Sequence, residues 1–204
     1  LILKKLKNYI IQFDIAFKIN NQIYVDLSFY SLNKTYLKGT VISNLRLKKI
    51  SGGYLDTDNI KIPILLISKK ICFVTHKEEI KAINEMANQY KGKVEFVVLY
   101  WDRKGLVKKA TKGFSKNVTI VFVNERENQL DMTLNSIKNS FGVPASFYMT
   151  ATKQLSNIDR KFYLKNLKLS TKKEFYENTY NDITRLLLEN ETMNQENHIS
   201  TREN

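Results

Sequence analysis

The hydrophobic and polar positions of this chain follow two periods, which predict a succession of short strands and amphipathic helices. Apolar residues spaced three and four apart indicate a helix, whereas short apolar runs or strict alternation indicate a strand. The first part of the chain is predicted to contain a helix over residues 2–17, a strand over 22–30 and a hairpin over 44–56. Ser51-Gly52-Gly53 supplies the turn of that hairpin, because glycine adopts the backbone conformations that a tight turn requires.

A regular alternation of strands and helices begins at Lys61. Strands are predicted at 62–67, 94–100, 118–123, 145–150 and 155–163, with helices over 75–90, 103–113 and 130–137. Thr75-His76-Lys77-Glu78 and Thr171-Lys172-Lys173-Glu174 are capping boxes, in which a threonine hydroxyl and a glutamate satisfy free amides at a helix start. The second box opens a final helix, whose predicted apolar face holds Tyr176, Tyr180, Ile183 and Leu187.

This order of elements predicts an α/β fold, in which a central mixed β-sheet is flanked by helices on both faces. The hairpin over 44–56 is then an N-terminal extension of the sheet. We divide the chain into an N-terminal helix and strand extension over 1–43, one domain over 44–189, and a disordered polar tail over 190–204.

Composition and charge narrow the classes of function. The chain has 204 residues and a net charge of +13, while residues 174–204 alone carry −5. Of the 33 basic residues 27 are lysine, and arginine, which recognises phosphates and bases with two parallel hydrogen bonds, is scarce. Nucleic acid is therefore not the expected partner, although a basic nucleic-acid or anionic-surface binder stays a second alternative. No apolar stretch is long enough for a transmembrane helix.

Three short segments resemble the TlpA-like branch of the thioredoxin superfamily. Residues 79–86, Glu-Ile-Lys-Ala-Ile-Asn-Glu-Met, are similar to the helix that follows that family's active site. Residues 93–102 resemble its second core strand, and Phe141 to Phe147 resembles its Gly-x-Pro-Thr segment with a cis proline. The resemblance covers about 44–165 and implies a thioredoxin-like three-layer fold.

The chain departs from that family where the family performs its chemistry, since the Cys-x-x-Cys motif is degenerate. Only one cysteine, Cys72, is present, so a dithiol cycle within the chain is excluded. If residues 79–86 set the register, the two family cysteines fall on Phe73 and His76. A shift of one residue instead places Cys72 at the attacking position and Thr75 at the resolving one, as in a monothiol site.

Each candidate site residue has two open interpretations. Cys72 is either a reactive thiol beside Lys69, Lys70 and Lys77, whose charges would lower its pKa, or a small buried core residue. His76 is either a base or hydrogen-bond donor near that thiol or an exposed residue of the first helical turn. By the resemblance, Val143 and Pro144 line a peptide groove beside residues 72–76, or the proline serves a structural turn only.

The leading hypothesis is a redox-inactive protein-binding or scaffold module that binds a protein or peptide at the groove near Pro144. The alternative is a single-cysteine thiol-disulfide oxidoreductase or glutathione-linked enzyme that uses Cys72. No cofactor is expected, and one cysteine with two histidines supports no metal site. The chain begins without a recognisable signal peptide, which favours the cytoplasm, while a trimmed N-terminus would leave the cell envelope open.

Overall fold

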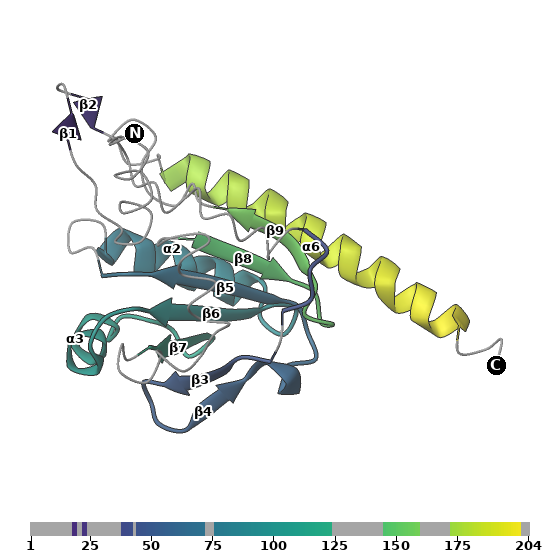
Figure 1. Cartoon of the computed structure of the whole chain (residues 1–204), viewed down its shortest axis with the longest axis horizontal. Helices are drawn as coiled ribbons and strands as arrows, with labels where there is room; N and C mark the ends of the chain where they lie inside the picture. Colours follow the sequence, from purple (N-terminus) through teal and green to yellow (C-terminus); the bar gives the residue numbers. More distant parts are fainter. Residues whose placement is uncertain are drawn as a thin grey trace, which may run out of the picture.

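The computed structural model describes residues 18–19, 22–23, 38–42, 44–71, 76–123, 145–159 and 172–200, and their core is one seven-stranded mixed sheet (Figure 1). The strand order is β4-β3-β7-β6-β5-β8-β9. Its members are β3 (Arg46–Lys49), β4 (Tyr54–Asp56), β5 (Ile64–Lys69), β6 (Glu95–Tyr100), β7 (Val118–Phe122), β8 (Ala145–Met149) and β9 (Leu155–Asp159). A separate antiparallel pair joins β1 (Lys18–Ile19) to β2 (Gln22–Ile23).

The centre of the sheet is parallel and its margins are antiparallel. β5 pairs with β6 and β6 with β7 in parallel, whereas β8 lies antiparallel to β5 and β3 lies antiparallel to β7. Parallel neighbours need a crossover, which α2 (His76–Gln89) supplies from β5 to β6 and α3 (Lys104–Ala110) from β6 to β7. The α/β fold with a central mixed sheet, and the hairpin that extends it, are therefore confirmed.

The two faces of the sheet bury separate apolar clusters. Side chains that alternate along β5, β6 and β7 pack under α2 and α6 (Lys172–Ser200) on one face, where Ile83 and Ile183 are fully buried. The opposite face packs against the segment that leads into β3, which contributes Ile42 and Leu45. All six side chains of β5 are buried, which explains why its first four residues form a continuous apolar run rather than an alternation.

The turn from β8 to β9 is held by Lys153, which combines a left-handed backbone conformation with two side-chain hydrogen bonds. Lys153 has a φ of 66°, in the left-handed region that favours glycine. Its Nζ donates to the carbonyls of Ile60 at 2.7 Å and Ala151 at 2.5 Å, and burial lowers the pKa of this amine. These bonds fasten the turn to the segment that precedes β5, so the strained backbone is offset by fixed partners.

α6 differs from its expected form in two ways. Thr179, Ile183 and Leu186 face the sheet, whereas Tyr180, expected on the apolar face, is 48% exposed. Ile183 is fully buried as predicted and Leu187 packs against the same core cluster, so the predicted face is confirmed at these positions and wrong at Tyr180. The helix also continues to Ser200, beyond residue 190 where a polar tail without regular structure is expected. Figure 1 shows this second half projecting beyond the sheet.

Several expected elements lie outside the described residues: the helices over 2–17 and 130–137 and most of the strand over 22–30. The division into an extension, a domain and a tail accordingly stays a prediction. None of the helices that the structure describes is both long enough and apolar enough to cross a lipid bilayer.

Candidate functional site

The candidate site lies where β5 and β6 end and α2 begins. β5 leads through Lys70 and Ile71 to residues 72–75, and α2 starts at His76. Five candidate residues lie outside the described residues: Cys72, Phe73, Thr75, Val143 and Pro144. The reactive thiol, the threonine cap and the peptide groove therefore remain predictions. His76 is the one candidate whose surroundings the structure gives.

His76 is buried rather than exposed, which corrects one of the two interpretations of this residue. The residue is 8% exposed, and its ring meets the Tyr100 ring edge-on, with 6.4 Å between centroids. Nε2 lies 2.7 Å from the carbonyl oxygen of Ala110 at the end of α3, so Nε2–H donates. A carbonyl oxygen can only accept a hydrogen bond, so Nε2 carries a proton. This hydrogen bond ties the start of α2 to the end of α3. The sequence placed His76 in the first turn correctly but could not show α3 beside it.

Beneath the first turn of α2 lies a buried ion pair that the sequence analysis did not identify. Lys69, the last residue of β5, pairs its Nζ with the Glu79 carboxylate, and their side chains are 1% and 10% exposed. The same Nζ lies 5.7 Å from the centroid of the Tyr100 ring, within the range of a cation–π contact. A lysine at the end of a strand that begins with four apolar residues was the available signal, because a buried lysine requires a partner.

Tyr100 and Asp102 complete this polar cluster. The Asp102 carboxylate accepts the Ile71 N–H at 2.9 Å, which joins the chain just after β5 to the chain just after β6. Burial, to which the Asp102 carboxylate adds, raises the pKa of Tyr100 well above its usual value, so the phenol stays protonated. Within the described part of the chain, neither the Tyr100 hydroxyl nor His76 Nδ1 has a hydrogen-bond partner.

Replacing Tyr100 with phenylalanine is expected to stabilise the protein by about 1 kcal/mol, because a buried hydroxyl without a partner costs roughly 1–3 kcal/mol. The measurement is the free energy of unfolding in urea. Tyr54→Phe is the matched control, since Tyr54 is 50% exposed and should show no change. A loss of stability in Tyr100→Phe beyond that control would mean that the hydroxyl is hydrogen-bonded in solution.

This arrangement favours packing over proton transfer. The cation and the carboxylate are already paired, and the imidazole donates to a backbone carbonyl. No group of three or more metal-ligating side chains occurs among the residues that the structure places. The described residues at the ends of β5 and β6 and at the start of α2 are thus held together by an ion pair and two hydrogen bonds.

Comparisons with known proteins identify the fold. No protein-family model matches the sequence, and no curated protein matches it either. Among solved structures, a protein described as thiol:disulfide interchange protein DsbE of Chlorobium tepidum is 16% identical with a TM-score of 0.58, over 74% of this chain and 99% of that one. A secreted disulfide oxidoreductase of Mycobacterium tuberculosis is 14% identical with a TM-score of 0.49, over 70% and 93%. The chain thus has a thioredoxin-like fold, structurally similar to DsbE- and TlpA-like thiol:disulfide oxidoreductases.

Proposed function

We propose that this chain is a redox-inactive member of the thioredoxin-fold proteins and acts as a protein-binding or scaffold module. The observation that carries the proposal is the single cysteine in 204 residues. Dithiol exchange needs one sulfur to attack the substrate and a second sulfur to resolve the mixed disulfide. A chain with one thiol cannot complete that cycle by itself, whatever the position of Cys72.

The hydrogen bonds and ion pair of Lys69 and His76 support the same proposal. A general acid or base must come within hydrogen-bond distance of the reacting group. Lys69 is 0% exposed and paired with Glu79, and His76 donates to Ala110. These groups stabilise the junction of β5, α2 and α3. A module that keeps its fold and loses its thiol pair retains a surface for a protein or peptide, which the resemblance places near Val143 and Pro144.

The start of α2 favours one competing function, a monothiol enzyme. Cys72 precedes His76 by four residues, and the N-terminus of a helix stabilises a nearby thiolate. In that case the Cys72 thiolate would attack the disulfide of a glutathionylated partner protein, form a Cys72–glutathione disulfide and release the partner's thiol. A reduced glutathione would then attack that disulfide, which restores the Cys72 thiol and releases oxidised glutathione. The binding module requires an unreactive Cys72 thiol, whereas the monothiol enzyme requires a reactive one.

The rate of Cys72 alkylation as a function of pH tests the proposal, because one cysteine gives a signal from a single source. We expect slow labelling of the native protein, rapid labelling only after unfolding, and no disulfide adduct on incubation with oxidised glutathione. We expect slow labelling because the packing around a structural cysteine keeps the alkylating reagent away from its sulfur. Partner binding should be unchanged in Cys72→Ser.

Fast native labelling with an apparent thiol pKa below about 7.5 would overturn the binding-module proposal. So would glutathione adducts that form on the wild type and are absent from Cys72→Ser. Lys77→Met is a useful companion variant, because it removes an exposed cation close to the thiol in sequence. It should slow alkylation only if the thiol is activated.

A further inference from the structure

A dense group of exposed cations lies on α3 and on the chain around it. Residues 103–117 contain six basic residues and no acidic residue. All six are exposed: Arg103, Lys104, Lys108, Lys109, Lys112 and Lys116. Among the residues that the structure describes, no carboxylate forms an ion pair with any of them. We call these six residues the α3 basic patch.

The stability of α3 does not explain these charges. Arg103 is the N-cap residue of α3 and makes no side-chain cap hydrogen bond, and Lys104 is the first helical residue. The N-terminus of a helix carries a partial positive charge, so cations at this end are unfavourable. Lys104 and Lys108 are also four residues apart on the helix, where like charges repel each other. The cations at its start therefore reduce the stability of α3, and a bound anionic surface would offset that cost.

The elements beside α3 do not neutralise the α3 basic patch. The start of α2 touches the end of α3, and the charges exposed on α2 balance each other: Lys77, Lys81, Glu78 and Glu85. Asp102 precedes the patch, and its carboxylate accepts the Ile71 N–H. Residues 174–204 carry −5, but the projecting part of α6 lies at the opposite end of the sheet from α3 (Figure 1). The positive charge of the patch is therefore open to a partner.

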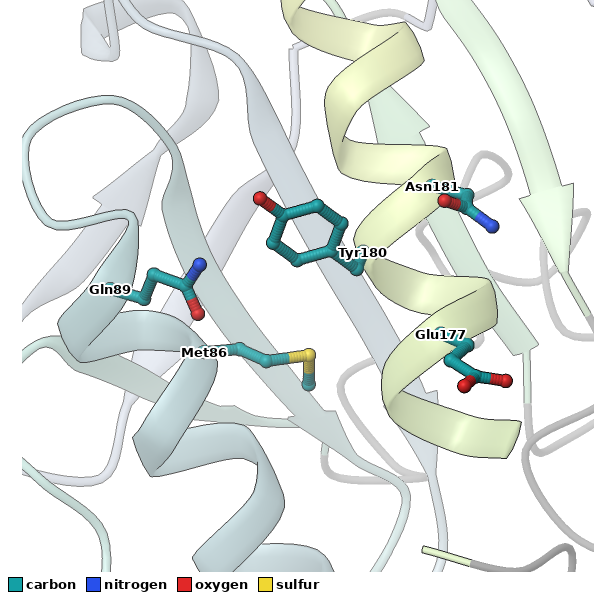
Figure 2. A pocket seen from close by; sticks show the side chains of 5 residues that line it. All are labelled: Met86, Gln89, Glu177, Tyr180 and Asn181. Carbon is teal, nitrogen blue, oxygen red and sulfur yellow. The ribbon is translucent and has the colours of Figure 1, made fainter. Parts of the chain in front are cut away.

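The exposed face of α3 is convex and carries an apolar side chain among its lysines. Val107 is buried beneath the helix, whereas Leu106 is 39% exposed between Gly105 and the lysines of the next turn. A groove of about 460 Å³ lies elsewhere, between α2 and α6, and none of its lining residues belongs to α3: Met86, Gln89, Glu177, Tyr180 and Asn181 (Figure 2). Peptides bind in grooves or along strand edges, whereas a helix face that combines lysines with an exposed leucine suits a planar bilayer.

We propose that the α3 basic patch binds the surface of a lipid bilayer that contains anionic phospholipids. The lysine ammonium groups pair with the headgroup phosphates, and Leu106 enters the boundary between headgroups and acyl chains. Phe114, the one aromatic residue of 103–117, packs against the core cluster beneath α2, so nucleic-acid bases would find no exposed ring in this segment to stack on. The proposal does not depend on the reactivity of Cys72.

Co-sedimentation of the full chain with vesicles tests the proposal. The chain should bind vesicles made of phosphatidylcholine and phosphatidylglycerol in equal parts, and should not bind vesicles of phosphatidylcholine alone. Binding should be lost at about 1 M salt, where charges are screened within about 3 Å. Equal binding to both kinds of vesicle would overturn the proposal. So would tighter binding to duplex DNA or to a poly-glutamate peptide than to the anionic vesicles.

A pair of double variants assigns the binding to α3. Lys108→Gln/Lys109→Gln should weaken vesicle binding about 25-fold, because each lysine at an anionic surface contributes about fivefold. Lys91→Gln/Lys93→Gln is the matched control, since it removes the same charge from two exposed lysines just after α2. These lie beyond the far end of α2, about 20 Å from its start, so the control should change binding less than about twofold. Equal losses in the two double variants would show an effect of net charge alone and would overturn the proposal.

The leucine on this face gives a second, independent comparison. Leu106→Ser should weaken binding about threefold or more, because binding at the interface grows with the apolar area that enters it. Leu188→Ser is the control, since Leu188 is 60% exposed on α6, and its binding should match that of the unchanged chain. Equal binding by the two leucine variants would contradict insertion of α3. Both positions are exposed, and thermal unfolding of each variant checks that it is folded.

Discussion

Replacing Lys69 with methionine is expected to destabilise the protein by about 3–5 kcal/mol, the cost of removing one partner from a buried ion pair. The Lys69 ammonium and the Glu79 carboxylate are 1% and 10% exposed, so water cannot take the place of the missing partner. The variant leaves a carboxylate desolvated under the first turn of α2 and also removes the cation beside the Tyr100 ring. The free energy of unfolding in urea measures the effect.

Three further variants separate the charge from the packing. Lys108→Met is the matched control, since Lys108 is exposed on α3 and its replacement should change stability by less than about 0.5 kcal/mol. The double variant Lys69→Met/Glu79→Met should recover much of the loss, because it removes both charges and keeps an apolar volume. Glu79→Gln alone should be destabilising. A Lys69→Met variant as stable as Lys108→Met would refute the ion pair.

Shortening the chain within α6 should have an effect of similar size or larger. A chain that ends after Asp182 lacks Ile183 and Leu186, which are both 0% exposed in the cluster beneath this helix. Each large apolar side chain removed from a core costs about 2–5 kcal/mol, and the two together approach the whole stability of a small domain. We expect this chain to show no cooperative unfolding transition by circular dichroism.

A chain that ends after Asn190 is the control for this experiment. It keeps the Asn190 side chain, which accepts the Ala151 N–H at 2.9 Å, and the ion pair of Glu189 with Lys38 at 2.5 Å. It loses only the projecting part of α6. Its stability should stay within about 0.5 kcal/mol of the full chain. A large loss here would show that the projecting part packs against something in solution.

Elements that depend on local periodicity could be predicted well from the sequence. The sequence predicts β5, β6 and β7 because runs such as Phe96 to Trp101 are apolar and bounded by polar residues. It predicts the hairpin from Gly52 and Gly53, which adopt φ of 105° and 69° in the turn. On α6 the sequence assigned Ile183 and Leu187 to the buried face correctly and Tyr180 wrongly, because periodicity alone allows two neighbouring choices of the buried stripe. That choice is made by the sheet beneath the helix, not by the helix itself.

The candidate site was less predictable because its contacts join distant parts of the chain. His76 was assigned to the first turn of a helix, but its burial depends on Ala110, which lies 34 residues away. The pairing of Lys69 with Glu79 follows from the closure of α2 onto the end of β5, which local patterns do not reveal. The groove beside Tyr180 needs α2 and α6 together, whose positions are about 90 residues apart.

The strand order also has a consequence for the chain while it is being made. β5 lies between β6 and β8, and Ile64 pairs with Met149, about 80 residues later. At synthesis rates of about 5–20 residues per second, β5 waits roughly 4–16 s for its second neighbour. During that interval the unpaired edge of a strand whose first four residues are apolar is open to any other extended segment. Nascent chains that stop between β7 and β8 should therefore be the ones that aggregate or bind chaperones most strongly.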